Sequence, residues 1–206
     1  MEQRTAKAEQ FIEDMLAYFG ERIWFLGGVP VKGCETPDWV LVTSDFVSDK
    51  EIDFYNQELE ELGLGGYCDG KEEFLQMDAL YLLEAATKAD IAVGKSETLL
   101  AAIDTGMLRL SIGEQAECAI KDIEYNLFEG KDITVLLEHL EQMDLLLDAI
   151  SLYLSRLDIE SQNRAKTGIP PLKSGINATI ERITKGETVD FSHLCRCLIA
   201  WLGEWK

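Results

Sequence analysis

The stretch from residue 133 to residue 157 constrains the fold more than any other part of the sequence. Its apolar side chains recur every three or four residues, which predicts a helix with a coiled-coil-like apolar stripe. At ~1.5 Å per residue this helix is about 38 Å long, so we expect it to be the axis of an antiparallel helical bundle and a surface for homo-oligomerisation. Flanking apolar residues widen the stripe, so more than one helix must pack on it. The stripe comprises Ile133, Leu136, Leu140, Met143, Leu147, Ile150, Leu154 and Leu157, widened by Leu137, Leu146 and Tyr153.

The N-terminal part of the chain predicts a small region that contains strands. Apolar spacing indicates a helix over residues 3–19, ended by Gly20. Segments rich in β-branched and aromatic residues predict strands over 22–28 and 39–46. Ser48 and Glu51 form a capping box that should open a helix running to Leu62.

The remaining elements are expected to be helices. The glycine-rich stretch "GLGGYCDG" (63–70) predicts a connecting loop, because its glycines lack the spacing of a phosphate-binding loop. The expected fold is therefore mainly α, with an α+β region over 1–70 and a helical bundle over 71–206, as two parts or as one integrated domain. Predicted helices cover 71–87, 97–110, 111–128 (or one longer helix), a stretch capped by Asp132 and stopped by Gly168, Pro170 and Pro171, then 174–185 and 190–205.

The charge of the chain is its strongest bulk property. The formal net charge is −19, with −22 carried by residues 1–160 and +3 by residues 161–206. Such a negative field disfavours direct binding to nucleic acid or to anionic membranes, and it suits divalent cations, basic protein partners or mimicry of nucleic acid. No apolar run is long enough to cross a membrane, and the N-terminus lacks the apolar region of a signal peptide. We therefore expect a cytoplasmic protein.

Cysteine and histidine give no catalytic or metal-binding pattern. The five cysteines have no regular framework, so reduced thiols are expected. Cys195 and Cys197 follow His193 but lack the usual spacing of zinc ligands, and Cys195 is expected to pack as a small apolar residue. With only two histidines, the sequence pairs neither of them with a serine or cysteine nucleophile.

Two acidic steps lie on the predicted hairpin around residues 129–132. Glu114 and Glu117 precede the turn, and Glu141 and Asp144 follow it. Glu117 and Asp144 are each about 13 residues from its midpoint, and three residues span roughly 4.5 Å, so the four carboxylates can share a level if both helices turn these faces together. Asp148 continues the acidic stripe. Crowded carboxylates attract a hard cation such as Mg²⁺.

A solvated acidic face explains the same spacing. The chain has 38 acidic residues, and pairs three residues apart also occur at Glu58 and Glu61 and at Glu138 and Glu141. Spacing alone therefore leaves two interpretations open, a metal site and a solvent-exposed acidic face.

A family resemblance adds to the metal interpretation. Residues 107–157 resemble the core helical hairpin of the MazG-like, all-α nucleotide pyrophosphohydrolases, whose signature is Glu-x-x-Glu on one helix and Glu-x-x-Asp on the next. The resemblance implies that Glu114, Glu117, Glu141 and Asp144 are catalytic ligands of Mg²⁺ or Mn²⁺, with Asp148 as an additional acid. The implied reaction splits a nucleoside triphosphate into a monophosphate and pyrophosphate. The family's phosphate-binding residues fall near Asn163, Arg164 and Lys166.

Three classes of function remain open from the sequence. The first is this metal-dependent pyrophosphohydrolase, with a nucleotide as its substrate. The second is an acidic, non-enzymatic binding protein, of the inhibitor, immunity, antitoxin or phage counter-defence kind, that engages a basic partner or mimics nucleic acid. The third is an assembly subunit that uses the long helix. The basic stretch "NRAKTGIPPLKSG" (163–175) either contacts phosphates or an acidic partner, or is a plain connector.

Overall fold

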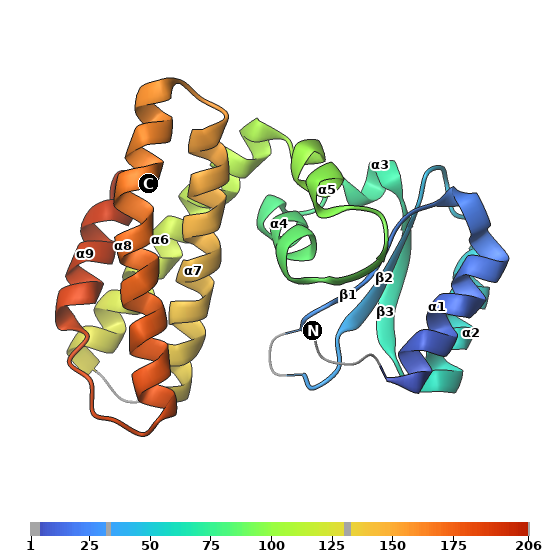
Figure 1. Ribbon diagram of the computed structural model, residues 1–206, viewed down its shortest axis with the longest axis horizontal. Helices are drawn as coiled ribbons and strands as arrows, with labels where there is room; N and C mark the ends of the chain where they lie inside the picture. The colour runs from blue at the N-terminus through green and yellow to red at the C-terminus, as the bar shows by residue number, and fades with distance from the viewer. Residues whose placement is uncertain (1–4, 32–33, 130–132, 206) are drawn as a thin grey trace. The chain divides into compact units, whose positions relative to one another are not determined.

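The computed structural model describes residues 5–31, 34–129 and 133–205, which form a mainly helical protein (Figure 1). The chain divides into two compact units, Met1–Ile103 and Asp104–Lys206. The division lies later than the expected boundary after residue 70. It does so because the strand Asp90–Val93 pairs with the N-terminal sheet and ties the segment before Asp104 to the first unit.

The first unit is built around a four-stranded sheet in the described residues, with strand order β3-β2-β1-β4. Strand β1 is antiparallel to β2 and to β4, and β2 is parallel to β3. In Figure 1, α1 and α2 lie on one face of the sheet, and α4 and α5 lie on the other. The elements are α1 (Ala6–Phe19), the 3-10 turn η1 (Gly20–Arg22), β1 (Ile23–Val29), β2 (Asp38–Thr43), α2 (Asp49–Leu62), β3 (Gly65–Gly70), α3 (Lys71–Phe74), α4 (Ala79–Lys88), β4 (Asp90–Val93) and α5 (Ser96–Ala102).

Consecutive residues of β1 and β2 are buried. Because successive side chains of a strand point to opposite sides, both faces of this sheet are covered. On the face under α1 and α2, Trp39 packs against Phe11, which also meets Tyr55 edge-on. On the other face, Phe25 stacks on Phe74 of α3 with ring centroids 6.1 Å apart. The sheet is therefore the middle layer of the unit.

Several N-terminal predictions are confirmed. Helix α1 ends at Phe19 and is capped by Gly20, whose φ is +55°. Strands β1 and β2 each begin within one residue of the expected start, and β2 ends at Thr43, three residues earlier than expected. The backbone N–H of Ser48 donates to Glu51 at 2.8 Å, and the full capping box is present. Helix α2 ends at Leu62, as predicted.

The prediction of a loop over residues 63–70 is wrong, since Gly65–Gly70 form β3, paired in parallel with β2. Close packing explains the glycine at position 66. A Cβ there would lie 1.9 Å from the carbonyl oxygen of Trp39 and 2.6 Å from the hydroxyl of Tyr55. This glycine therefore permits close contact inside a sheet, whereas the sequence suggested turn chemistry.

The prediction of unbroken helices after residue 71 is also wrong. The expected helix 71–87 is divided into α3 and α4, because the Asp78 carboxylate accepts hydrogen bonds from the N–H groups of Leu80 and Tyr81 and caps a new helix. Strand β4 follows. The expected helix 97–110 is likewise divided between α5 and α6, with Asp104 accepting from the N–H of Met107.

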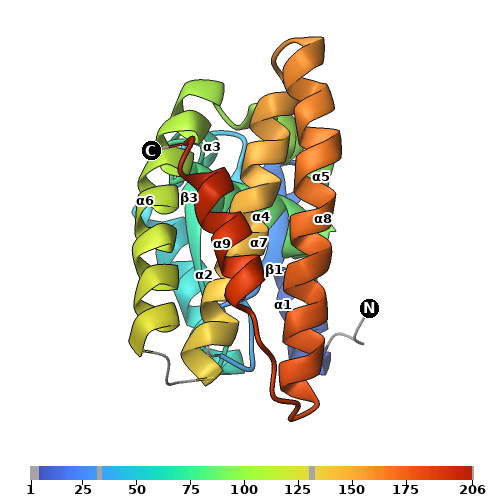
Figure 2. The same ribbon diagram turned by 90° about the vertical axis from the view of Figure 1, so that its left-hand side faces the viewer.

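The second unit consists, in its described part, of four helices. Helix α6 packs on α7 and α9, and α8 also packs on α7 and α9 (Figure 2). Ser111 lies inside α6, which confirms the alternative of one longer helix, and the predicted helix ends at Gly130 and Asp132 lie outside the described residues. None of the described helices has an apolar stretch long enough to cross a membrane. The helices are α6 (Thr105–Glu129), α7 (Ile133–Ser155), α8 (Ile159–Thr184) and α9 (Ser192–Leu202).

Six members of the apolar stripe of the long helix are buried within the chain itself. Ile112 and Ile120 of α6, Ile176 of α8 and Leu198 of α9 are also buried, and α6 and α8 both pack on α7. Leu157 is exposed and lies beyond the end of α7. Oligomerisation through the stripe stays a prediction. The buried members are Leu136, Leu140, Met143, Leu147, Ile150 and Leu154.

The predicted stop of the long helix at Gly168, Pro170 and Pro171 is wrong. Helix α7 ends at Ser155, and Asp158 caps α8 by accepting from the N–H of Ser161 at 2.8 Å. All three expected stop residues lie inside α8. The two exposed prolines cannot donate to the carbonyls four residues earlier, but packing of the buried face of α8 keeps the helix continuous.

Candidate functional site

The two predicted carboxylates of α6 lie on its outer side. Glu114 and Glu117 are exposed, whereas Ile112 and Ala116 on the same helix are buried. Glu117 forms an ion pair with Lys121, one turn further along, at 2.8 Å. These carboxylates therefore face solvent and a lysine on their own helix.

The two predicted carboxylates of α7 separate from each other. Glu141 is exposed, while Asp144 is partly buried and faces α8, where its Oδ2 lies 3.2 Å from Nζ of Lys173. Asp148 contacts the same ammonium at 2.7 Å. The sequence indicated the two aspartates but missed Lys173, which lies 25 residues after Asp148 in the chain.

Lys173 offsets one of the two negative charges that Asp144 and Asp148 place on this part of α7. Burial opposes its charged form, but hydrogen bonds and attraction from Asp148 and Asp144 outweigh burial, so the pKa of Lys173 is raised. Oδ1 of Asp144 is buried and has no hydrogen-bond partner among the described residues. Asp148 and Lys173 also line an open groove of about 690 Å³, together with Ser151, Pro170, Ser174 and Asn177.

The described residues do not bring the four predicted ligands together. They contain no group of three or more histidine, cysteine or acidic side chains placed to hold a metal ion. The physical reason is helix rotation: Glu114, Glu117 and Glu141 project to solvent from faces away from the buried side chains, and Asp144 is turned toward Lys173. These four side chains do not fit a shared Mg²⁺ or Mn²⁺ site in this arrangement.

The predicted phosphate-binding residues lie on the exposed side of α8. Asn163, Arg164 and Lys166 are all exposed. Arg164 forms an ion pair with Glu204, and its guanidinium lies 5.5 Å from the ring centroid of Trp201. The stretch 163–175 lies inside α8 and is helical. Its arginine, Arg164, already has a carboxylate partner.

The cysteine and histidine residues near the C-terminus behave largely as expected. Cys195 is buried in the core, as predicted. Burial raises the pKa of its thiol to about 11, which leaves it protonated at neutral pH. Sγ of Cys197 lies 3.7 Å from Nε2 of His193.

A second cluster, not singled out by the sequence, lies on the first unit where α1 and α2 pack side by side. The helices are antiparallel, since Lys7 near the start of α1 donates to the carbonyl oxygen of Leu62 at the end of α2. The ring of Tyr18, near the end of α1, stacks on Phe54 of α2. Between these contacts lies a group of carboxylates. We call this cluster the acidic–aromatic face; it comprises Asp14, Tyr18, Phe54, Glu58 and Glu61.

The carboxylates of this face repel one another. Burial and the nearby charges of Asp14 and Glu61 raise the pKa of Glu58. Asp14 and Glu61 instead accept hydrogen bonds from the amides of Gln10 and Gln57, at 3.0 and 2.8 Å. No described lysine or arginine forms an ion pair with any of the three acids. The cluster therefore holds negative charge without a described counter-charge.

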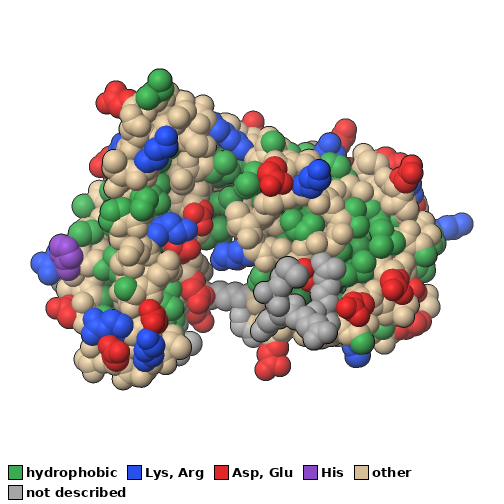
Figure 3. Space-filling view, viewed as in Figure 1, with side chains coloured by type: hydrophobic (Ala, Val, Ile, Leu, Met, Phe, Trp, Pro, Cys, Tyr) green, Lys and Arg blue, Asp and Glu red, His purple; other side chains and the backbone are tan. Residues whose placement is uncertain are grey.

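The aromatic part of the face is accessible. The Tyr18 and Phe54 rings are 4.0 Å apart and nearly parallel, and 49% of Tyr18 is exposed. In Figure 3 carboxylates gather at the lower right, over the layer that α1 and α2 form. Together α1 and α2 contain nine acidic and two basic residues, and the whole first unit has 21 acids and 8 bases.

Comparison of the chain with protein-family models, with curated proteins and with solved structures gave no match.

Proposed function

We propose that this protein is a non-catalytic binding protein whose acidic–aromatic face docks a basic segment of a partner protein. The observation that carries the proposal is the crowding of Asp14, Glu58 and Glu61 beside an exposed aromatic stack, with no ion-pairing cation among the described residues. It favours the acidic binding protein over the other classes that the sequence left open.

A basic partner would relieve the cost of this crowding. A lysine or arginine placed among the three carboxylates removes the repulsion that raises the pKa of Glu58. The face of an aromatic ring also attracts a cation, by about 0.5–1 kcal/mol at an exposed site. The formal charge of −13 on the first unit would attract a basic partner over a longer range and speed its association.

Titration with fluorescent lysine and arginine peptides tests the proposal. Binding should weaken steeply as salt rises, because exposed charges are screened within about 10 Å at 0.1 M salt. The triple variant Asp14→Asn, Glu58→Gln, Glu61→Gln should lose most of the affinity. Tyr18→Ala should weaken binding of the arginine peptide more than that of the lysine peptide, because arginine stacks on aromatic faces.

A charge-matched control separates a specific face from net charge. The triple variant Glu72→Gln, Glu97→Gln, Glu124→Gln removes three exposed carboxylates from α3, α5 and α6. It should bind the peptides nearly as tightly as the unaltered protein. Equal losses in the two triple variants would mean that only net charge is sensed, and the proposal would fail.

The class of partner follows from the same electrostatics. A basic surface that normally binds nucleic acid would suit the face, so inhibitor, immunity, antitoxin and phage counter-defence roles all belong to this proposal. Direct binding to nucleic acid is disfavoured by the charge. A cytoplasmic location and homo-oligomerisation are further parts of the proposal.

A nucleotide pyrophosphohydrolase remains a second proposal, favoured by one observation. Oδ1 of Asp144 is a buried carboxylate oxygen with no described hydrogen-bond partner, and Asp144 pairs with Lys173, which lines a groove together with Asp148. Release of pyrophosphate from a panel of nucleoside triphosphates with Mg²⁺ or Mn²⁺ tests it. Activity lost in Asp144→Asn and kept in Glu138→Gln would support it, and inactivity across the panel would reject it.

A further inference from the structure

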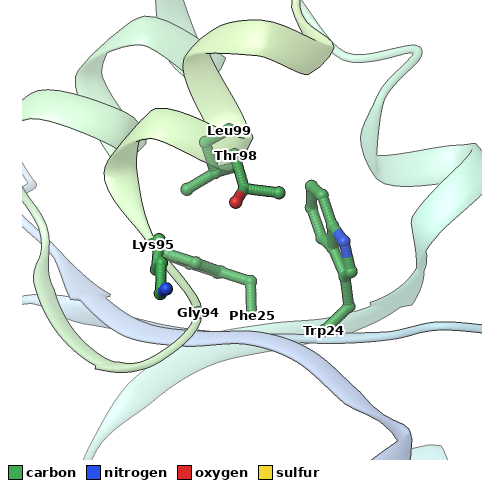
Figure 4. Close-up of a pocket in the computed structure, with 6 residues that line it drawn as sticks. All are labelled: Trp24, Phe25, Gly94, Lys95, Thr98 and Leu99. Carbon is green, nitrogen blue, oxygen red and sulfur yellow. The ribbon is translucent and has the colours of Figure 1, made fainter.

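A pocket of about 300 Å³ lies in the first unit between β1 and the start of α5 (Figure 4). The ring of Trp24 forms one side, Lys95 and Phe25 lie on the opposite side, and Thr98 and Leu99 lie above. Gly94 completes the lining. The pocket belongs neither to the acidic–aromatic face nor to the groove beside Lys173.

The backbone around the pocket accounts for its shape. Gly94 has φ of +99°, and a Cβ there would lie 2.9 Å from the carbonyl oxygen of Trp24. The glycine therefore lets the chain pass close over β1 before it turns into α5. The hydroxyl of Ser96 donates to the carbonyl oxygen of Ala86, which fixes the start of α5 to α4.

Neighbouring residues hold the Trp24 ring in place. The Phe74 ring meets it edge-on, with centroids 6.3 Å apart and planes at 66°. The ammonium of Lys71 lies 5.0 Å from the centroid of the Trp24 ring. A ring held in this way offers a pre-positioned surface for stacking.

The pocket is locally cationic in an acidic unit. Lys95 is the charged residue among its lining side chains, and it forms no ion pair with a described carboxylate. Lys71 beside Trp24 likewise has no described carboxylate partner. The hydroxyl of Thr98 forms no hydrogen bond with another described residue and faces the pocket. These groups favour an anion with a flat apolar body.

We propose that this pocket binds a small planar aromatic carboxylate. Its ring would stack on Trp24 and lie over Phe25 and Leu99, its carboxylate would pair with the ammonium of Lys95, and Thr98 would donate a hydrogen bond. The volume is at the lower end of the range of roughly 300–1,000 Å³ typical of ligand pockets, which suits one ring or two fused rings. The proposal is independent of partner docking on α1 and α2.

Titration of the full-length, ¹⁵N-labelled protein with benzoate and indole-3-carboxylate tests this site by NMR. The chain has four tryptophans, so four indole N–H signals are expected, and Trp→Phe variants assign them. The Trp24 signal should shift saturably while those of Trp39, Trp201 and Trp205 stay in place. Benzamide, which lacks the charge, and cyclohexanecarboxylate, which lacks the flat ring, should bind several-fold more weakly.

Two variants address the ligand contacts directly. Lys95→Met should weaken benzoate binding about fivefold, a modest loss expected of a solvent-exposed ion pair. Lys88→Met is the matched control, because Lys88 is exposed on α4 and pairs with Glu84. Trp24→Leu should weaken binding about tenfold, as expected for loss of a stacking partner.

The result that overturns the proposal is equally specific. It is the absence of a saturable shift of the Trp24 signal with benzoate at up to about 10 mM. A dissociation constant of about 10 mM is expected for a ligand of about nine heavy atoms that gains roughly 0.3 kcal/mol per atom. Equal affinity for benzoate, benzamide and cyclohexanecarboxylate would also overturn it. These comparisons use the unaltered protein, so they hold even if Trp24→Leu does not fold.

Discussion

The ring of Tyr18 stacks on the ring of Phe54, with centroids 4.0 Å apart and planes 13° from parallel. The two residues belong to different helices and are 36 positions apart in the sequence. Their contact joins α1 to α2 at one end of the acidic–aromatic face and leaves half of the tyrosine accessible. The stack therefore serves stability and supplies an exposed aromatic surface.

The Tyr18→Ala variant should lose about 0.5–1.5 kcal/mol of unfolding free energy, the usual value of an aromatic pair. Urea unfolding followed by circular dichroism measures the change. Tyr125 is a suitable control, since it is an exposed tyrosine of α6. An equal loss in Tyr125→Ala would show that the stack contributes nothing beyond an ordinary surface tyrosine.

The Glu58→Gln variant should gain up to about 0.5 kcal/mol of unfolding free energy at neutral pH, because an exposed charge interaction is small. The folded-state pKa of Glu58 is raised by burial, Asp14 and Glu61, so ionised Glu58 disfavours folding above that pKa. The gain should disappear as the pH falls below the ordinary value of 4.5. Urea unfolding of both proteins from pH 7 to pH 4 checks this. A gain that persists at pH 4 would contradict it.

The Glu51→Gln variant should lose about 1–2 kcal/mol of unfolding free energy at pH 7, because it breaks the capping box with Ser48 and the ion pair with Arg22. Hydrogen bonds from the side chain and N–H of Ser48, and then from Arg22, lower the pKa of Glu51 to about 2. The stabilisation is present above the ordinary value of 4.5 and is lost as the pH falls toward 2. Glu60→Gln, an exposed residue of the same helix, should show no such pH-dependent loss.

The Gly66→Ala variant should lose more than about 3 kcal/mol of unfolding free energy, because backbone strain and overpacking act together. The added Cβ would lie 1.9 Å from the carbonyl oxygen of Trp39. Gly186→Ala separates the two effects, because Gly186 has φ of +77° and open space around it, so its cost should be about 1 kcal/mol. Thermal unfolding measures both, and equal costs would refute the steric explanation.

The Lys173→Met variant should lose about 1–3 kcal/mol of unfolding free energy, because it leaves Asp144 and Asp148 close together without their cation. Adding Asp148→Asn should restore part of the loss, and a double-mutant cycle measures the coupling. Lys166→Met changes an exposed lysine of the same helix and should be nearly neutral. Independent, additive effects of Lys173→Met and Asp148→Asn would exclude the ion pair.

Local chemistry made part of the fold predictable. The capping box at Ser48 and Glu51 and the apolar stripe of α7 depend on neighbours within a few residues, and both are found. Strand β3 was not predicted because the need for glycine at position 66 comes from close packing against Trp39, 27 residues away. The continuity of α8 through Pro170 and Pro171 likewise depends on tertiary packing, which outweighs the local signal to stop.

The candidate sites were predictable only in their acidic parts. Asp144 and Asp148 were identified from the sequence, but Lys173 pairs with them across two helices, and spacing within one helix cannot reveal this. The pair Glu58 and Glu61 was visible as one acidic step among several. An earlier signal existed, since Asp14 lies four residues before Tyr18 and Phe54 four before Glu58, which places acid and aromatic on one side of each helix.

The sheet of the first unit separates two surfaces of opposite character. Its α1–α2 side carries the acidic–aromatic face, and its α4–α5 side carries the cationic pocket beside Trp24. Because a packed layer lies between them, occupation of one surface leaves the charges and contacts of the other unchanged. Binding free energies at the two surfaces should then add, so that the affinity for the peptide is the same with and without the small anion bound, and the reverse.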